Sequence, residues 1–574
     1  MSSIAAFRFP AERRKRAAQI SALLLIAAAV YLNSLLNGFA LDDVLIVQDN
    51  SRVHDLGALK DIWLTPYWPS YGVELGLWRP LTIFLFAVQW AIGDGGPLAF
   101  HVVNVLLHAL NTLLVFVLVE RVTSRRAALV GALIFAVHPV HTEAVANVVG
   151  QSELLVAAFL LGACLVHSGR PPGLTVSWSR RAVLAALFLG GLLTKEHAVV
   201  LPGLLLSLDL AQRRIPLDRT GMLRYARAVS PVLLLLLIAL TLYLVVRFHV
   251  LQGALLGIEA GPQLHFLREE YRVLNGLRAF PEVLSLLIFP YQLAADYSPA
   301  MILPVESWTF MTAVGAVLLG ATVLLALATP WKPAAGLPAA WFMISFVTVS
   351  NLLFPVGVLI AERTLYLPSV ALSLAVAYGW LAGAPKVSPS MRHVAAAALL
   401  LVLILGGVRT WIRNPDWKST RTIQYALMRD HPESYKAQWT FAIWQYRQGN
   451  PEVARPHFQL ALDLYPRDSQ LMSEYGAFLL EQGEIDRAVE LLEAAHEIHP
   501  SSSAFAVRLA NGYLAAGRYA DAMRIATALD RIHRPLADEI RSAARAGASD
   551  SAAYAGARDS AAHAGARDTG STPP

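Results

Sequence analysis

Long apolar runs, separated by short polar stretches, occupy most of the first 410 residues of the chain. A helix needs about 20 apolar residues to cross the hydrocarbon core of a bilayer, and several runs approach that length. We predict about eleven crossings, at residues 17–36, 101–118, 127–137, 154–166, 182–193, 198–210, 229–246, 308–328, 341–353, 372–381 and 394–408. The predicted fold class is therefore all-α, with a polytopic helical membrane domain over residues 1–410.

Two further apolar runs have the signs of segments that do not cross. Residues 81–92 form a short run that Asp94-Gly-Gly-Pro97 ends, and residues 283–293 lie between Pro281 and Pro290 without flanking basic residues. We predict that both lie at the membrane interface or re-enter it, within two large outer loops at residues 37–98 and 247–305.

Basic residues between the runs predict the orientation of the chain. Cytoplasmic loops of membrane proteins carry an excess of Lys and Arg. The basic groups stand at Arg13–Arg16, Arg121–Arg126, Arg180–Arg181, Arg213–Arg227 and Lys386–Arg392. They place the N-terminus in the cytoplasm, with the first run as an uncleaved span, and the C-terminal domain outside. Ala- and Arg-rich composition and the lack of a retention signal favour a bacterial inner membrane with a periplasmic C-terminal domain.

Composition agrees with a membrane protein. The chain is 56% hydrophobic and only 15% charged, and its mean hydropathy is +0.48. The net charge of +6 arises largely from the basic groups between apolar runs, so we attribute it to orientation and exclude nucleic-acid binding. The single cysteine, Cys164, excludes an intramolecular disulfide.

An internal repeat follows the membrane domain, over residues 411–544. A spacing of 34 residues separates Gly449, Gly483 and Gly517, then Ala454, Ala488 and Ala522, then Ala442, Gly476 and Ala510, and also Pro466 and Pro500. This is the tetratricopeptide period, and we expect the small residues where paired helices approach closely. Such repeats bind extended peptides on their concave face, which predicts a protein or peptide partner; the alternative is a helical spacer that binds nothing. Residues 545–574 are of low complexity and lack large apolar side chains, so we expect disorder.

Pairs of charged residues stand where several apolar runs end, all on the predicted outer side. Asp42 and Asp43 follow the first run, where a carboxylate pair is costly and suited to proton removal; the alternative is that the pair only marks a helix end. The other groups are Arg79, then His138, His141, Glu143 and Glu153, then Lys195 and Glu196, then Glu362 and Arg363. The two histidines suggest a metal site, but Pro139 disturbs their spacing and no further ligands complete a zinc set, so we expect no metal. The Lys–Glu and Glu–Arg pairs are explained either by mutual salt bridges or by a shared polar cavity.

These motifs together resemble a known family. In order they are Asn37-Gly-x-x-x-Asp-Asp43, Trp78-Arg-Pro-Leu81, Phe100-His-x-x-Asn104 with His108, His138-Pro-Val-His-Thr-Glu-Ala-Val145 followed by Gly150, Lys195-Glu196, and Ala361-Glu-Arg-x-x-Tyr-Leu-Pro-Ser369. With the repeats, they resemble the transmembrane and tetratricopeptide-repeat O-mannosyltransferases, which have the GT-C glycosyltransferase fold. The chain departs from the family at Gln151, where the family often has arginine.

The resemblance implies an inverting transfer of mannose or another hexose from a polyisoprenyl-phosphate donor to a Ser or Thr hydroxyl of an exported protein. Asp42 would be the base and Asp43 would orient the acceptor, or the reverse. The other charged and histidine residues named above would bind the phosphate and sugar of the donor. No cofactor beyond this donor substrate is indicated; a divalent metal is left open as an alternative but is not indicated.

Three other functions remain open from the sequence. The first is a membrane-anchored tetratricopeptide scaffold, although an anchor needs only one or two spans. The second is a transporter of a lipid-linked sugar, which would place charges near the bilayer midplane in repeated halves. The third is a transferase that acts on a glycan or a lipid.

Overall fold

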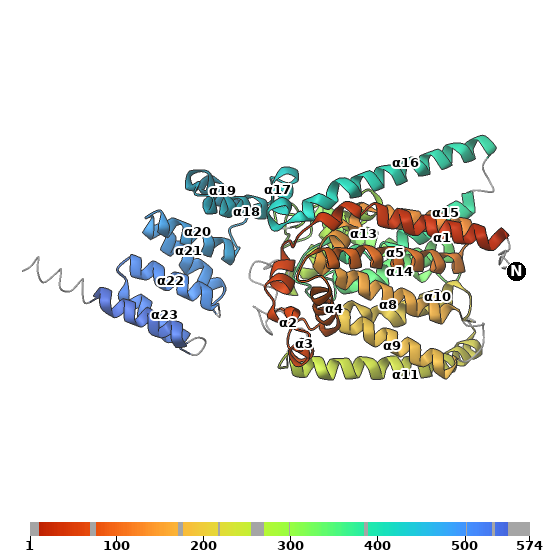
Figure 1. Cartoon of the computed structure of the whole chain (residues 1–574), viewed down its shortest axis with the longest axis horizontal. Helices are drawn as coiled ribbons and strands as arrows, with labels where there is room; N and C mark the ends of the chain where they lie inside the picture. Colours follow the sequence, from red (N-terminus) through yellow and green to blue (C-terminus); the bar gives the residue numbers. More distant parts are fainter. Residues whose placement is uncertain are drawn as a thin grey trace, which may run out of the picture. The chain divides into compact units, whose positions relative to one another are not determined.

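The computed structural model describes residues 11–68, 76–169, 176–215, 218–253, 269–297, 299–383, 388–500, 502–530 and 534–548. The regular structure in these ranges is helical (Figure 1). The described residues divide into two compact units, one up to Pro432 and one from Glu433 onward. The first unit extends beyond the boundary predicted at residue 411, because Trp417 and Ile423 pack into an apolar cluster with Ala40 and Ala146.

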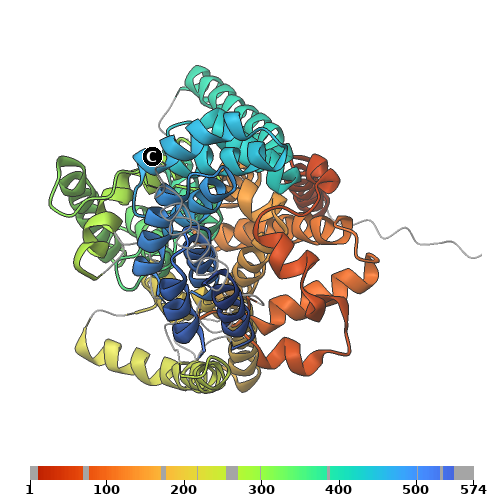
Figure 2. The same ribbon diagram turned by 90° about the vertical axis from the view of Figure 1, so that its left-hand side faces the viewer.

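The first unit is a bundle of helices, in which every predicted crossing overlaps one helix. The longer members lie side by side (Figures 1 and 2). The eleven helices are α1 (Ala11–Ala29), α5 (Leu98–Val122), α6 (Arg125–Val137), α8 (Gln151–Ser168), α9 (Trp178–Thr194), α10 (Leu201–Ala211), α11 (Arg219–Val250), α13 (Phe310–Leu327), α14 (Pro333–Phe346), α15 (Val370–Gly383) and α16 (Pro389–Arg413). An all-α fold with several apolar helices is therefore confirmed.

Five of these helices are long and apolar enough to cross a membrane: α5, α8, α11, α13 and α16. A sixth is obtained if α6 and the segment Pro139–Ala146, which are bent by 50° relative to each other, count as one span. Helices α6, α10, α14 and α15 have 11 to 14 residues and fall short of the usual length. The number of crossings therefore stays a prediction.

Short helices and loops gather at one end of the bundle (Figure 1). They include α2 (Ser51–His54), α3 (Leu59–Leu64) and α4 (Pro80–Ile92), with α4 at the first interfacial segment predicted. These helices pack over an apolar cluster that contains Ile46, Ile62, Phe86 and Phe100. Helix α12 (Glu269–Ile288) overlaps the second such segment. Several short helical segments connect the longer helices of this unit. They are α7 (Thr142–Ala146), the 3₁₀ turns η4 (Val148–Gly150), η5 (Glu196–Val200), η8 (Glu362–Leu365) and η9 (Asn414–Lys418), and the helix α17 (Thr420–Asp430).

Helix α5 presents one polar face to the loops at this end. His101, Asn104, His108 and Asn111 recur at helical spacing, and all four are buried. His101 Nε2 lies 3.2 Å from the Gly38 carbonyl oxygen, and Asn104 donates to the Val145 and Asn147 carbonyls at 3.2 and 2.9 Å. These motif residues thus hold the loops in which the acidic residues stand.

The second unit consists of paired antiparallel helices. The pairs are α18 (Tyr435–Arg447) with α19 (Pro451–Leu464), α20 (Ser469–Glu481) with α21 (Ile485–Ile498), and α22 (Ser503–Ala515) with α23 (Tyr519–Leu529), followed by a helix over residues 534–548. Most of the predicted tail, residues 549–574, lies outside the described residues, whereas residues 545–548 belong to that last helix.

The repeated small residues have two different roles. Ala454, Ala488 and Ala522 are fully buried between helices, and a Cβ on Gly476 would meet Leu492 Cγ at 2.8 Å, as expected for close helix approach. The column Gly449, Gly483 and Gly517 differs, because these residues have φ of +79°, +80° and +71° and nothing within 4 Å of a Cβ. This glycine column is therefore required by the left-handed turn between paired helices and not by close packing.

Candidate active site

The loop that carries the two aspartates is tied to the segment after the last long helix of the bundle. Asn37 Nδ2 donates to the Asn414 carbonyl at 3.0 Å, and the backbone N–H of Gly38 donates to the Lys418 carbonyl at 2.9 Å. The N–H of Leu41 donates to Thr420 Oγ1 at 2.8 Å. These bonds hold the loop as it turns at Leu41, whose φ is +51°.

Asp43 is fully buried and joins two loops. Its carboxylate accepts from the backbone N–H groups of Ala40 at 3.0 Å, Val148 at 3.3 Å and Val149 at 2.8 Å. Burial raises the pKa of Asp43 to about 7, against the opposing effect of these hydrogen bonds. With no exposed surface, Asp43 is suited to holding its neighbour in place.

Asp42 is the accessible member of the pair, with its side chain 33% exposed. Its Oδ2 lies 3.3 Å from Arg363 Nη2, while Nη1 of the same guanidinium lies 3.1 Å from Glu143 Oε1. Glu143 also accepts from the backbone N–H of Arg363 at 2.8 Å. Arg363 therefore bridges two carboxylates from distant loops and fixes the position of Asp42.

Two more ion pairs complete this cluster. Arg79 binds Glu196 through two bonds, Nη2 to Oε1 at 2.6 Å and Nε to Oε2 at 3.2 Å, and its guanidinium carbon lies 5.0 Å from the centre of the Tyr67 ring. Lys195 pairs with Glu153, both being largely buried. Glu153 is also within electrostatic range of Arg79 and of Arg363, so the pairs belong to one network. We call these seven residues, Asp42, Arg79, Glu143, Glu153, Lys195, Glu196 and Arg363, the charged cluster.

Two residues that the sequence analysis did not single out also belong here. Arg247 on α11 donates to the Gly76 carbonyl at 2.6 Å and to the Tyr243 hydroxyl at 2.8 Å, and it interacts electrostatically with Glu196. Tyr67 interacts with Arg79, Asp42 and Arg363. Arg247 was missed because it is a single basic residue directly after the apolar run 229–246, and no charged residue adjoins it in the sequence.

The predicted histidines lie elsewhere. His138 Nε2 bonds to the Leu287 carbonyl at 2.9 Å, and His141 Nε2 bonds to Ser369 Oγ at 2.7 Å. The His141 ring packs on Phe135 and Tyr366 at 4.5 and 4.6 Å between ring centres. Both side chains are buried in the packing between helices, and their hydrogen bonds do not lead to the charged cluster. Among the residues described above, no three His, Cys, Asp or Glu side chains gather as a metal site would require.

Glu362 occupies a third environment, next to its neighbour Arg363 in sequence but turned away from it. Its Oε1 accepts from the Ala294 N–H at 2.6 Å and from the Tyr297 hydroxyl at 2.9 Å. Burial raises the pKa of Glu362 to about 8, although Arg413 opposes the shift. Glu362 thus holds the segment after α12, and the structure does not bring it into contact with Asp42.

Comparisons with known proteins agree with this architecture. The family described as "Tetratricopeptide repeat" matches residues 479–545, and "YpiA-like, C-terminal tetratricopeptide repeats" matches residues 436–502. The mouse (Mus musculus) protein O-mannosyl-transferase TMTC3 is 26% identical over 476 residues, which cover 78% of this chain and 51% of that protein. The mouse protein O-mannosyl-transferase TMTC4 is 28% identical over 484 residues, covering 73% of this chain and 63% of that protein. The chain therefore spans about half the length of the first of these curated relatives.

A solved structure has a weaker likeness. The archaeal oligosaccharyltransferase AglB from Archaeoglobus fulgidus aligns with a TM-score of 0.38 and 14% identity, over 78% of this chain and 60% of that one. A likeness at this level does not establish a shared fold. The relatives in sequence, in contrast, align over about three quarters of this chain. The resemblance to the transmembrane and tetratricopeptide-repeat O-mannosyltransferases that the motifs indicated is therefore confirmed.

Proposed function

We propose that this chain is an integral-membrane glycosyltransferase of the GT-C type. It transfers mannose or a related hexose from a polyisoprenyl-phosphate donor to a Ser or Thr hydroxyl of an exported protein. Support comes from the names of the relatives, which are protein O-mannosyl-transferases, and from the charged cluster at the loop end of the bundle. The single observation that carries the proposal is the half-buried Asp42 carboxylate beside Arg363.

Asp42 acts as the base in this proposal. It takes the proton from the acceptor hydroxyl as that oxygen attacks the anomeric carbon. Among the described residues Arg363 is the ion-pair partner of the carboxylate, and a third of the Asp42 side chain is exposed, so an incoming hydroxyl can reach it. Arg363 is held from its far side by Glu143, which keeps the base oriented during the attack. A single displacement with one base inverts the anomeric configuration.

The leaving group is a lipid phosphate, which needs no general acid but needs positive charge placed beforehand. Arg79 and Lys195 supply this charge in the proposal. Each is paired with a carboxylate, Glu196 and Glu153 respectively, and these partners hold the cations in fixed positions before the donor arrives. Arg79 is the better phosphate ligand of the two, because its planar guanidinium forms paired hydrogen bonds with phosphate oxygens.

The repeats hold the acceptor protein in the proposal. Their first helices are linked by hydrogen bonds between residues one repeat apart: Trp439 Nε1 donates to Glu474 Oε2 at 3.1 Å, and Arg508 Nη1 donates to Ser473 Oγ at 3.0 Å. Such bonds give these helices a fixed polar surface, as a binding face for an extended peptide requires. The predicted orientation puts both the repeats and the charged cluster on the outer side of the membrane.

The test is a transfer assay with the purified full-length chain. Polyprenyl-phosphate mannose and a Ser/Thr-rich peptide should yield a peptide heavier by one hexose, with the α or β configuration opposite to that of the donor. Incubation with the Asp42→Asn variant serves as the control. Transfer to a glycan or lipid acceptor but to no peptide would assign a different acceptor class, and no transfer to any acceptor would favour a scaffold.

A further inference from the structure

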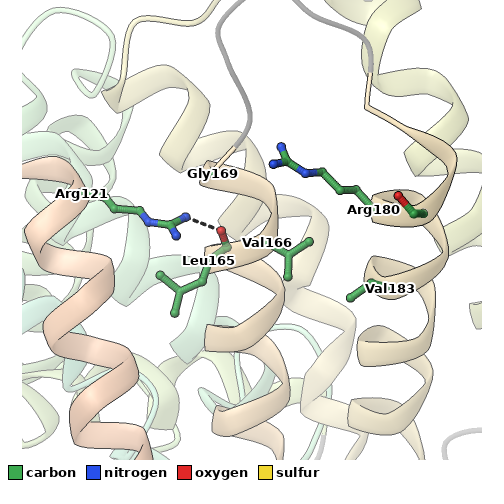
Figure 3. A pocket seen from close by; sticks show the side chains of 7 residues that line it. Arg121, Leu165, Val166, Gly169, Arg180 and Val183 are labelled. Carbon is green, nitrogen blue, oxygen red and sulfur yellow. Dashed lines mark hydrogen bonds between the residues drawn. The ribbon is translucent and has the colours of Figure 1, made fainter. Parts of the chain in front are cut away.

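An open pocket of about 480 Å³ lies among α5, α8 and α9. It is formed near the C-terminal ends of α5 and α8 and the N-terminal end of α9, where the basic residues predict the cytoplasmic surface. Figure 3 shows Arg121 and Arg180 reaching toward the C-terminal end of α8 from opposite sides, with Val166 and Val183 between the helices below. None of these residues belongs to the charged cluster.

Two positive charges meet in this pocket without a carboxylate. Arg121 and Arg180 are close enough to interact electrostatically. Arg121 is oriented by hydrogen bonds of its Nη1 to the Leu165 carbonyl and to Ser168 Oγ, neither of which neutralises its charge. In the described part of the chain, neither guanidinium lies within ion-pair distance of an Asp or Glu side chain. Like charges held together in this way favour an anion between them.

The start of α9 adds to the same positive field. Arg180 stands in the first turn of this 17-residue helix, and Ser177 at its N-cap makes no side-chain cap hydrogen bond. The first N–H groups of a helix have no partner within the helix, and they carry partial positive charge toward its N-terminus. Ser179 also lines the pocket, and its hydroxyl shares a hydrogen bond with the Ser177 hydroxyl at 3.2 Å.

The remaining walls are apolar, and the basic residues predict that this end of the bundle meets the cytoplasmic membrane surface. Leu165, Val166 and Val183 line the pocket, and Trp178, the residue before Ser179, is 70% exposed. Exposed tryptophan is enriched where membrane helices meet the headgroup layer. A soluble anion would leave the apolar walls uncovered, whereas the acyl chains of a lipid would cover them.

We propose that this pocket binds the phosphate of an anionic membrane phospholipid in the cytoplasmic leaflet. The phosphate lies between Arg121 and Arg180, and the upper acyl chain rests on Leu165, Val166 and Val183. The ligand is thus recognised by charge and by an apolar contact together, at the end of the bundle that the basic residues predict as cytoplasmic. This site is separate from the proposed transfer reaction and does not depend on it.

The experiment measures the thermal stability of the full-length protein in neutral detergent at constant ionic strength. Short-chain phosphatidylglycerol, short-chain phosphatidylcholine and inorganic phosphate are titrated in parallel. Because a ligand that binds only the folded state raises Tm in proportion to its occupancy, the titration yields an apparent affinity. Phosphatidylglycerol should raise Tm at the lowest concentration, and inorganic phosphate should have no comparable effect.

Two matched variants identify the pocket. Arg180→Gln should raise the half-effective phosphatidylglycerol concentration about tenfold, as expected for one lost charge-assisted hydrogen bond to phosphate. Arg126→Gln removes the same charge from the exposed start of α6, another basic position of the predicted cytoplasmic surface, and should leave that concentration unchanged. The Tm of each variant without lipid shows that it is folded.

Three results would overturn the proposal. The first is the absence of any rise in Tm with phosphatidylglycerol. The second is an equal loss in both variants, which would mean that only the overall charge of this surface matters. The third is an equal rise with inorganic phosphate, which would assign the pocket to a soluble phosphate compound.

Discussion

The two adjacent aspartates should respond in opposite ways to the same substitution. Asp42→Asn removes the proposed base from a half-exposed position where Arg363 is its ion-pair partner. We expect turnover to fall by roughly two to four orders of magnitude. Stability should change by less than about 1 kcal/mol, because this ion pair is partly open to solvent and Arg363 keeps Glu143 as its second partner.

Asp43→Asn should instead destabilise the protein. The two carboxylate oxygens accept three backbone N–H groups, and an amide keeps only one oxygen. Asparagine therefore places its amide N–H against either the Val149 N–H, which keeps Asn147 Oδ1 as an acceptor at 3.1 Å, or the N–H groups of Ala40 and Val148. In either case at least one buried N–H, of the backbone or of the new amide, has no acceptor. Each buried donor without an acceptor costs about 1–3 kcal/mol. We expect a clear fall in Tm, with turnover reduced to the extent that the Asp42 loop is displaced.

The assay pairs hexose transfer per folded molecule with Tm for both variants. Protein abundance must be measured as well, since a variant that does not accumulate yields no rate. A folded Asp42→Asn variant with full turnover would refute the assignment of the base. A folded Asp43→Asn variant with unchanged Tm and no turnover would reverse the two roles.

Further predictions concern the rest of the chain. Arg363→Lys should lower kcat at least tenfold with little effect on Tm, because lysine keeps the charge but cannot bridge two carboxylates. An unchanged kcat would show that the bridge from Asp42 to Glu143 is not needed for turnover. Gly476→Leu should melt the repeats, which circular dichroism would detect, since even a Cβ there meets Leu492; normal melting would contradict the packing. Raising the pH from 5 to 8 should destabilise the protein, because Glu362 and Asp43, whose pKa values burial raises to about 8 and about 7, must ionise in the folded state. Glu362→Gln should remove its share of this fall, up to about 1.4 kcal/mol per pH unit, and a pH profile that this substitution leaves unchanged would show that Glu362 is not responsible. A reporter that replaces the repeats after residue 432 should lie outside the cytoplasm, and a reporter inserted within residues 213–227 should lie in the cytoplasm. The opposite result would place the charged cluster on the cytoplasmic side, where the proposed reaction could not modify exported proteins.

The arrangement of helices was largely accessible from the sequence. Apolar length and basic residues located a helix at each of the eleven runs, and the short run at residues 81–92, which we predicted to be interfacial, coincides with α4. Length alone does not decide which helices cross the membrane, because α6, α10, α14 and α15 are shorter than the usual span. The 34-residue period located the repeats, and two family matches agree with it.

The candidate site could be predicted only in part from the sequence, because residues that are neighbours in the sequence can have side chains in different environments. Asp42 and Asp43 read alike, but one faces solvent and one is buried under three N–H groups. Glu362 and Arg363 were interpreted either as a mutual salt bridge or as part of a shared polar cavity, yet they contact different neighbours. His141 looked like a polar group at a span end, and it is packed against aromatic rings. In each case the tertiary contact, and not the residue type, decides what the side chain is able to do.

The hydrogen bonds between the Asp42 loop and η9 affect when the site can form during biosynthesis. Asn37 and its partner Asn414 are separated by 377 residues, so the loop leaves the ribosome long before the segment that holds it. At synthesis rates of about 5–20 residues per second, that interval is roughly 20–75 s. During this time the first helices are already synthesised, but the hydrogen bonds that hold the aspartate loop cannot yet form. A nascent chain stopped before residue 414 would therefore carry its acidic pair but no assembled site, and the site would become competent only as the repeats begin to emerge.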